Sequence, residues 1–362
     1  MFVLDSHCDT PSQIHRLRDV GIWNPHGHVD FPKMKKGGVD GAFFALYVPP
    51  SLKGAEATSY ALELLADTYD AIEKNKSQAV LATSAQEAYD AKARGLTSVF
   101  LGLENGSAIQ ESLPLLRMFY RMGVRYMTLA HSAHNRICDS SSPEKPLWGG
   151  LSPFGKEVVK EMNRLGMLID VSHISDAAFY DVLDLSSKPV AATHSCCRAL
   201  AGHRRNMSDD MIRALAAKGG VIQINFYPVF LDDGFAESLA ASGIESECDA
   251  VEAEFIKDPG NPAKRAAWYA VEDKLASMTR PTYKRIADHI DHAVSVAGIE
   301  HVGLGSDFDG ISVTPAGMED ISCFGLLLEE LRARGYGEGD IARIAGGNFL
   351  EILRLQSAPE GR

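Results

Sequence analysis

Eight short apolar or β-branched segments recur along the chain between Phe2 and Asp307, and most of them are apolar at nearly every position. A strand with one solvent-exposed face would alternate between apolar and polar residues. A parallel strand buried on both faces instead reads as a continuous apolar run. The pattern therefore predicts parallel strands at Phe2–His7, Val39–Val48, Ser98–Glu104, Val124–His131, Met167–His173, Pro189–His194, Gly220–Phe226 and His301–Asp307.

Segments with a helical pattern separate these strands. Several of them open on a serine that can cap a helix, such as Ser175 and Ser208, or close on a glycine. The pattern predicts helices at Ala57–Lys74, Ser112–Met122, Gly155–Leu165, Ser175–Leu185, Ser208–Lys218 and Tyr283–Val296.

The alternation of strands and helices indicates βαβ units and a parallel sheet. Eight such units favour an α/β fold of the (β/α)8 TIM-barrel type. The alternative is an open doubly wound sheet, whose dinucleotide-binding version needs GxGxxG after an early strand. The first strand is followed by His-Cys-Asp-Thr-Pro instead, and the chain contains no Walker-type loop. We therefore predict the barrel.

Residues 227–280 interrupt the regular alternation of predicted strands and helices. This stretch is long, acidic and helical in pattern, as in "FAESLAASGIESECDAVEAEF" and "NPAKRAAWYAVEDKLASM". We expect an extended helical excursion after the seventh strand, inserted in a single domain that spans residues 1–362. Two interpretations stay open. The segment is either an elaborated surface connection or a lid or homodimer contact beside the active-site mouth, because βα loops lie at that face of a barrel.

The bulk composition narrows the class of partner. The chain has 362 residues, of which 45% are hydrophobic, and a formal net charge of −12. It can bury a large core, and its negative charge argues against a nucleic-acid partner, which calls for a basic surface. It has no apolar run of 18 residues, so we expect no membrane-spanning helix. Strand-like sequence begins at Phe2 without a basic and apolar leader, so we expect a cytoplasmic protein.

Polar and titratable residues gather at the carboxyl ends of the predicted strands. In a (β/α)8 barrel these ends converge on one face, where active sites are built. A single histidine at a strand end is more often a hydrogen-bonded or exposed residue than a ligand. The joint placement of four histidines and three carboxylates reverses that expectation. The residues are His7, Asp9, Glu104, His131, His173, His194 and Asp307.

Imidazole and carboxylate donors suit zinc, and also manganese, iron or cobalt. The set exceeds what one catalytic zinc needs, since such a site uses three protein ligands and an open position. Two ions that share a carboxylate fit better, and they would hold a bridging hydroxide and polarise a carbonyl, which implies metal-assisted hydrolysis. We predict two divalent ions per chain, most readily zinc, with Glu104 as the bridge, His7 and Asp9 on one ion, and His173 and His194 on the other.

These motifs, in this order, resemble the membrane (renal) dipeptidase family of binuclear zinc peptidases, within the amidohydrolase-like barrels. The resemblance covers nearly the whole chain. It rests on "DSHCD" at the start, "GLEN" at 102–105, "GVRYMTLAHS" at 123–132, "LGMLIDVSHIS" at 165–175, "PVAATHS" at 189–195, "RRNMSDD" at 204–210, "HVGLGSDFDG" at 301–310 and "GGNFLEIL" near the end.

The resemblance implies the same five metal ligands and three further roles. His131 resembles the substrate-facing histidine that binds the oxyanion of the tetrahedral intermediate. Arg205 resembles the arginine that receives the terminal carboxylate of the substrate, and a guanidinium fork suits a carboxylate. Asp307 resembles the residue that takes a proton from the nucleophilic water and returns it to the leaving amine. Asp309 is the alternative to Asp307, and Arg204 is the alternative to Arg205.

Other candidates receive a structural interpretation. The segment "DHIDH" places His289 and His292 three residues apart on a predicted helix, which superficially suggests a metal site, but a cap or surface network is the better reading. Cys196 and Cys197 invite a nucleophile reading that a hydrolytic metal site does not need. None of the six cysteines forms a CxxC pair, so we expect reduced thiols. Cys8 should point away from the ligands beside it, because side chains alternate along a strand.

The expected function is hydrolysis of small dipeptides with free termini, with a C-terminal D-residue among the candidates. Another amidohydrolase-type reaction on a cyclic amide, a lactone or an N-acyl amino acid is the alternative, because a barrel does not fix the function. If the protein were a non-catalytic one that kept the shell of the site, we would expect at least one metal ligand to be lost. Every expected metal ligand is present in the sequence. We expect neither the leader nor the C-terminal anchor signal of the animal proteins that the chain resembles. Asn-Gly follows Glu104 where Gly-Gly is common.

Overall fold

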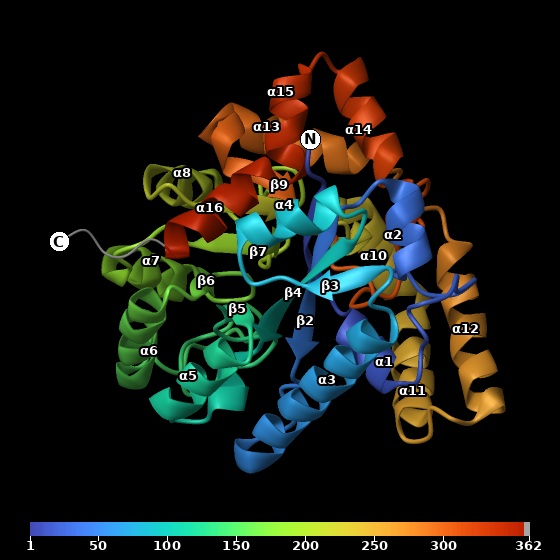
Figure 1. Ribbon diagram of the computed structural model, residues 1–362, viewed down its shortest axis with the longest axis horizontal. Helices are drawn as coiled ribbons and strands as arrows, with labels where there is room; N and C mark the ends of the chain where they lie inside the picture. The colour runs from blue at the N-terminus through green and yellow to red at the C-terminus, as the bar shows by residue number, and fades with distance from the viewer. Residues whose placement is uncertain (358–362) are drawn as a thin grey trace.

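A nearly closed barrel of parallel strands forms the centre of the molecule (Figure 1). The computed structural model describes residues 1–357. Its strands are β1 (Leu4–Cys8), β2 (Gly41–Tyr47), β3 (Ala79–Leu81), β4 (Thr97–Glu104), β5 (Val124–Thr128), β6 (Leu168–Asp170), β7 (Ala191–Ser195), β8 (Val221–Ile224) and β9 (Val302–Leu304). The hydrogen-bonded order is β1-β2-β4-β5-β6-β7-β8-β9, and every pairing is parallel.

The barrel closes just beyond the carboxyl ends of β9 and β1. The backbone N–H of Asp9 donates to the carbonyl of Phe308 at 2.8 Å, and that of Asp307 donates to the carbonyl of His7 at 3.0 Å. These bonds draw the segments that follow the first and last strands together at the mouth. The predicted α/β TIM-type barrel is therefore confirmed.

The predicted strands differ from the observed ones mainly at their carboxyl ends. The run predicted through His173 ends at Asp170, and the run predicted through Asp307 ends at Leu304. His173 and Asp307 themselves have positive φ values of 68° and 65°. Such values are uncommon outside glycine, and they turn the backbone out of the strand. The three-residue strand β3, which pairs with β4, was not predicted, because so short a run carries no period.

The predicted helices all form and surround the barrel (Figure 1). Ser175 and Ser208 are N-caps, as predicted, and their side chains accept from the N–H groups of Ala178 and Met211. Among the described residues, no helix has the length and apolar character to cross a bilayer. The helices outside residues 227–280 are α1 (Thr10–His15), α2 (Phe31–Gly37), α3 (Gly54–Lys74), α4 (Ala85–Ala93), α5 (Leu113–Arg121), α6 (Pro153–Leu165), α7 (Asp176–Leu185), α8 (Asp209–Ala217), α13 (Lys284–Ala297), α14 (Phe324–Ala333), α15 (Glu338–Ala342) and α16 (Asn348–Ser357).

Aromatic side chains fill the barrel below the strand ends. The rings of Phe43 and Phe100 stack at 4.7 Å between centroids, and Phe349 of α16 meets Phe43 edge-on at 5.3 Å. Tyr126 lies against Gly102, where an added Cβ would come within 2.2 Å of its ring. An aromatic ring can therefore cross the barrel only because position 102 carries no side chain. This apolar filling leaves the carboxyl ends of the strands as the polar end of the barrel.

Residues 227–280 form the predicted helical excursion, which follows β8, the seventh strand around the barrel. Its helices are α9 (Pro228–Leu231), α10 (Asp233–Ser242), α11 (Ile244–Ile256) and α12 (Pro262–Ala276). α11 and α12 pack against each other and lie beside α1 (Figure 1). Arg16, just after α1, forms an ion pair with Glu252 of α11 at 2.7 Å. The rings of His26 and Tyr269 stack at 4.0 Å, so α12 is attached to the loop that follows α1.

Candidate active site

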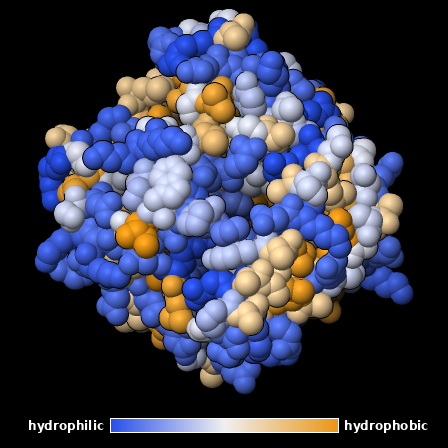
Figure 2. Space-filling model, turned by 90° about the vertical axis from the view of Figure 1, so that its right-hand side faces the viewer, coloured by the Kyte–Doolittle hydropathy of each residue, from blue (hydrophilic) through white to orange (hydrophobic). Residues whose placement is uncertain are grey.

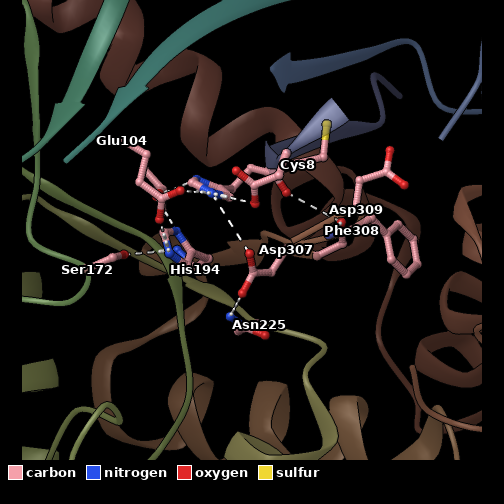
Figure 3. Close-up of polar contacts among 12 residues, drawn as sticks. Cys8, Glu104, Ser172, His194, Asn225, Asp307, Phe308 and Asp309 are labelled. Carbon is pink, nitrogen blue, oxygen red and sulfur yellow. Dashed lines mark hydrogen bonds and ion pairs between the residues drawn. The ribbon is translucent and has the colours of Figure 1, made fainter. Parts of the chain in front are cut away.

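The five predicted metal ligands converge at the polar end of the barrel. Glu104 lies between two pairs of side chains (Figure 3). Its Oε2 is 3.6 Å from Nε2 of His7, which in turn lies 3.6 Å from Oδ2 of Asp9. Its Oε1 is 3.2 Å from Nε2 of His173 and 3.4 Å from Nε2 of His194. One oxygen of Glu104 therefore faces each of the two predicted pairs.

These donors fit divalent cations. Nε2 of His7 and Oδ1 of Asp9 are buried and have no hydrogen-bond partner among the described residues. Burial, with a smaller contribution from nearby cationic groups, holds the pKa values of His173 and His194 well below the usual value, so both imidazoles are neutral. A buried polar atom without a partner is costly, and a neutral imidazole offers a lone pair to a metal. Imidazole nitrogens and carboxylate oxygens at these distances are a normal donor set for zinc and related ions.

Hydrogen bonds to neighbouring side chains orient two of the histidines. The hydroxyl of Thr193 donates to Asp170 at 2.7 Å and lies 2.8 Å from Nδ1 of His194. Because the only hydroxyl proton of Thr193 goes to Asp170, Nδ1 of His194 carries the proton that joins the two residues. The lone pair of His194 is then on Nε2, which faces Glu104. Tyr126 similarly places its hydroxyl 2.8 Å from Nδ1 of His7.

Asp170 was missed by the sequence analysis although it ends a strand. It lies close enough to His7 and His194 to belong to a group of possible ligands. Its oxygens, however, accept from the hydroxyls of Thr128 and Thr193 and from two backbone N–H groups. A carboxylate with this many donors supports the histidines rather than a cation. The strand was predicted to continue to His173, so the strand-end argument selected His173 and left Asp170 inside the predicted strand.

Asp307, rather than Asp309, belongs to the cluster. Its Oδ1 lies 3.9 Å from Nε2 of His7, and its Oδ2 accepts from the amide of Asn225 at 2.8 Å. Burial raises the pKa of Asp307 above its usual value. Asp309 instead points away from Glu104 and is bound by Arg18 at 2.6 Å (Figure 3). Asn225, at the end of β8, is a second strand-end residue that the sequence analysis missed.

His131 and Arg205 face the same cavity as the cluster. Nε2 of His131 is 3.8 Å from Oε1 of Glu104, and burial together with the charge of Arg205 lowers the pKa of His131 to about 3. Arg205 is 6% exposed, and its guanidinium donates to the hydroxyl of Ser195 and the carbonyl of His194, both at 2.7 Å. Among the described residues it has no carboxylate partner within salt-bridge distance, and its Nε has no hydrogen-bond partner.

Arg204, the alternative to Arg205, is exposed and donates to the carbonyl of Ser142. It is absent from the lining of the cavity, so the geometry favours Arg205.

The cavity has a volume of about 410 Å³, which is within the usual range for a small-molecule site. Asp9, Glu104 and His173 of the metal-ligand cluster line its floor, and side chains of α11 and α12 form part of its wall. The excursion is thus more than a surface connection, because it borders the mouth of the barrel. Figure 2 views the molecule from the side on which α12 lies, and hydrophilic residues dominate this face.

The candidates given a structural interpretation make structural contacts, but His289 lies in the core and not in the cap or surface network that was predicted. His289 is fully buried and links the backbone N–H of Cys197 to the carbonyl of Leu231, at 3.1 and 3.0 Å. His292 binds Asp209 at 2.8 Å. The thiols of Cys8, Cys196 and Cys197 each contact a backbone carbonyl, and Cys8 points away from the ligands (Figure 3). All six cysteines are free, as predicted.

Comparisons with known proteins match nearly the whole chain. The family model described as membrane dipeptidase (peptidase family M19) matches residues 1–359. The dipeptidase verJ of Clonostachys rogersoniana is 32% identical over 358 residues, which cover 95% of this chain and 79% of that protein.

Two solved structures also match nearly the whole chain. The probable dipeptidase PvdM from Pseudomonas aeruginosa superposes with a TM-score of 0.83 at 27% identity, over 98% of this chain and 95% of that chain. A metallo peptidase from Rhodobacter sphaeroides, liganded with a phosphinate mimic of the dipeptide L-Ala-D-Ala, gives a TM-score of 0.80 at 25% identity, over 98% of this chain and 99% of that chain.

Proposed function

Because the chain belongs to the membrane dipeptidase family, peptidase family M19, and is a metal-dependent hydrolase, we propose that it cleaves the peptide bond of small dipeptides with free termini. One observation carries this proposal. The buried guanidinium of Arg205, which has no carboxylate partner among the described residues, shares a cavity with the cluster around Glu104. Such a cation calls for an anionic group on the ligand. The Rhodobacter structure, liganded with its dipeptide mimic, supports a dipeptide and extends the proposal to a C-terminal D-residue.

We propose two divalent ions per chain, zinc first among the candidates. When bound, such ions act as Lewis acids that polarise a carbonyl and lower the pKa of a water molecule. Glu104 is proposed to contact both ions, because its two oxygens face different pairs of donors. His7 and Asp9 would hold one ion, and His173 and His194 the other.

The remaining residues are proposed to bind the substrate and move protons. Arg205 can receive the terminal carboxylate, which fixes the position of the dipeptide. Neutral His131 can donate an N–H to the carbonyl oxygen as negative charge develops there. Asp307, held by the amide of Asn225, can take a proton from the attacking water and deliver it to the leaving amine.

The test is a hydrolysis screen over dipeptides in L,L, L,D and D,L combinations, with C-terminal amides and N-acyl amino acids alongside. We expect dipeptides to be cleaved, and Arg205→Ala to raise KM for them by about 10- to 100-fold, as for the loss of a charge-assisted contact of about 1.5–3 kcal/mol. Arg204→Ala is the matched control, because this neighbouring arginine lies outside the cavity. Unchanged dipeptide kinetics in Arg205→Ala would refute the substrate assignment. Cleavage of N-acyl amino acids without cleavage of dipeptides would identify the alternative activity.

A further inference from the structure

The cavity wall formed by the excursion is acidic. Glu245, Asp249 and Glu252 line the cavity from α11, and Glu272 lines it from α12. The three residues of α11 follow the spacing i, i+4, i+7, so they share one face of that helix. Like charges at this spacing destabilise a helix, and an acidic stripe on a cavity-facing surface is therefore a costly arrangement.

Arginines neutralise only part of this charge. Glu252 is paired with Arg16 at 2.7 Å. Glu245 only accepts a hydrogen bond from the hydroxyl of Tyr227, at 3.3 Å. Asp249 and Glu272 have no hydrogen bond or ion pair among the described residues. The wall thus presents three carboxyl groups to the cavity without an ion pair among the described residues. Arg18, which lies near Glu272, is itself paired with Asp309 at 2.6 Å.

A second polar group faces the cavity without a partner. Ser12, on α1, is 4% exposed and lines the cavity, yet its hydroxyl makes no hydrogen bond with any described residue. A buried hydroxyl without a partner is rare in folded proteins, and it can accept an N–H from a ligand. Burial raises the pKa of Glu272 to about 8; the nearby charge of Arg18 opposes this rise, and the charges of Asp309 and Glu252 add to it. A further cation beside Glu272 would favour its ionised form.

The wall and Arg205 lie on different flanks of the cluster. Arg205 is held by Ser195 and the carbonyl of His194, at the end of β7. Ser12 lies on α1, directly after β1, and Arg16 ties α11 to the same region. In the barrel β8 and β9 separate β7 from β1. A dipeptide whose carboxylate lies on Arg205 would therefore direct its first residue toward the acidic wall.

We propose that this acidic wall binds a cationic side chain on the N-terminal residue, so that the enzyme prefers dipeptides that begin with lysine or arginine. This inference rests on the proposed dipeptidase function. It extends that function, because it assigns the substrate class from residues that lie outside the metal cluster.

The test compares lysyl-alanine with norleucyl-alanine, whose side chain has a similar length without the charge. We expect kcat/KM to be about ten-fold higher for lysyl-alanine, as for one charge-assisted hydrogen bond in a partly solvated site. Glu272→Gln and, separately, Asp249→Asn should each lower this ratio by about three-fold or more. Asp273→Asn is the matched control, because Asp273 is an exposed neighbour on α12 outside the cavity lining, and it should leave the ratio unchanged.

The outcomes separate this inference from the proposed function. If no dipeptide is cleaved, the proposed function fails. If dipeptides are cleaved with equal kcat/KM for lysyl-alanine and norleucyl-alanine, the inference alone is refuted. A preference for alanyl-lysine over lysyl-alanine refutes the placement of the first residue at the wall. Because Glu272 and Asp249 have no ion pair to lose and lie among like charges, both variants should unfold at or above the temperature of the parent, and kinetics measured on them report on the site.

Discussion

The hydroxyl of Thr193 is predicted to control metal binding through the tautomer of His194. Thr193→Val keeps the branched shape of the side chain but removes the group that joins His194 to Asp170, through contacts of 2.8 and 2.7 Å. Without that acceptor, the imidazole proton can move to Nε2, which lies 3.4 Å from Oε1 of Glu104. A proton at Nε2 occupies the lone pair that a cation needs. The variant should therefore bind divalent ions more weakly.

The expected effect of Thr193→Val has two parts, a loss of metal affinity and a loss of stability in the metal-free protein. Loss of a hydrogen bond that orients a metal-ligating histidine lowers metal affinity by about 10- to 100-fold. In the metal-free protein, a fully buried Nδ1 of His194 without a hydrogen-bond partner, in either tautomer, costs about 1–3 kcal/mol. A chain of this length unfolds with an entropy of about 0.8 kcal/mol per kelvin, so this cost corresponds to a fall in Tm of about 1–4 °C.

The assay is equilibrium dialysis against zinc buffered by a chelator, with metal content measured in the protein and Tm measured after metal removal. Thr193→Ser is the matched control, because it keeps the hydroxyl and should bind metal nearly as the parent does. If Thr193→Val bound zinc with the affinity of the parent, the tautomer argument would be wrong. If Thr193→Ser lost as much affinity as Thr193→Val, packing of the methyl group rather than the hydroxyl would be responsible.

Two further predictions concern acidic residues. Asp307→Asn keeps a residue that tolerates the positive φ of 65°, so we expect kcat to fall about 100- to 10,000-fold with little change in KM, and a kcat within ten-fold of the parent would exclude the proposed proton transfer. Hydrogen bonds from Arg164 and Arg117 lower the pKa of Glu161 from 4.5 to about 2. The folded-state pKa lies below the unfolded one, so this stabilisation is complete above about pH 4.5 and is lost as the pH falls toward 2. Thermal melts from pH 6 to pH 3 should therefore show a smaller acid-induced fall in Tm for Glu161→Gln than for the parent, and equal falls would contradict the assignment.

The sequence predicted the positions of the site residues because parallel strands bring their carboxyl ends to one face. That argument needs only the order of strands, which the continuous apolar runs reveal. It does not distinguish Asp307 from Asp309, since both would lie on the same side of an extended segment. The structure separates them because both residues have positive φ, 65° and 68°, and the chain there is no longer extended. Asp307 turns toward His7, and Asp309 turns toward Arg18.

The residues that support the metal ligands could not be predicted from the sequence, for a different reason. Tyr126 lies inside a predicted strand, where an aromatic residue is normally part of the core. Its hydroxyl reaches His7 only because Gly102 leaves room for the ring across the barrel. The acidic stripe on α11 is visible as a spacing in the sequence, but the spacing alone does not say whether that face meets solvent, another helix or a cavity. These assignments depend on contacts between segments far apart in the chain.

In the proposed substrate complex, the charges around the cavity favour one direction of binding. Burial, and to a smaller extent the nearby charge of Glu104, raises the pKa of Asp9 to about 7. Divalent ions in the cluster would offset the negative charge of its carboxylates and make the floor of the cavity electropositive. The acidic wall near Ser12 would then be the negative flank, and Arg205 the positive one. A substrate with a terminal carboxylate and a cationic first residue matches both flanks in a single orientation, which holds its peptide bond over Glu104. The reversed orientation would set the carboxylate against Asp249 and Glu272, so the same charges that favour the substrate also exclude its reversed binding.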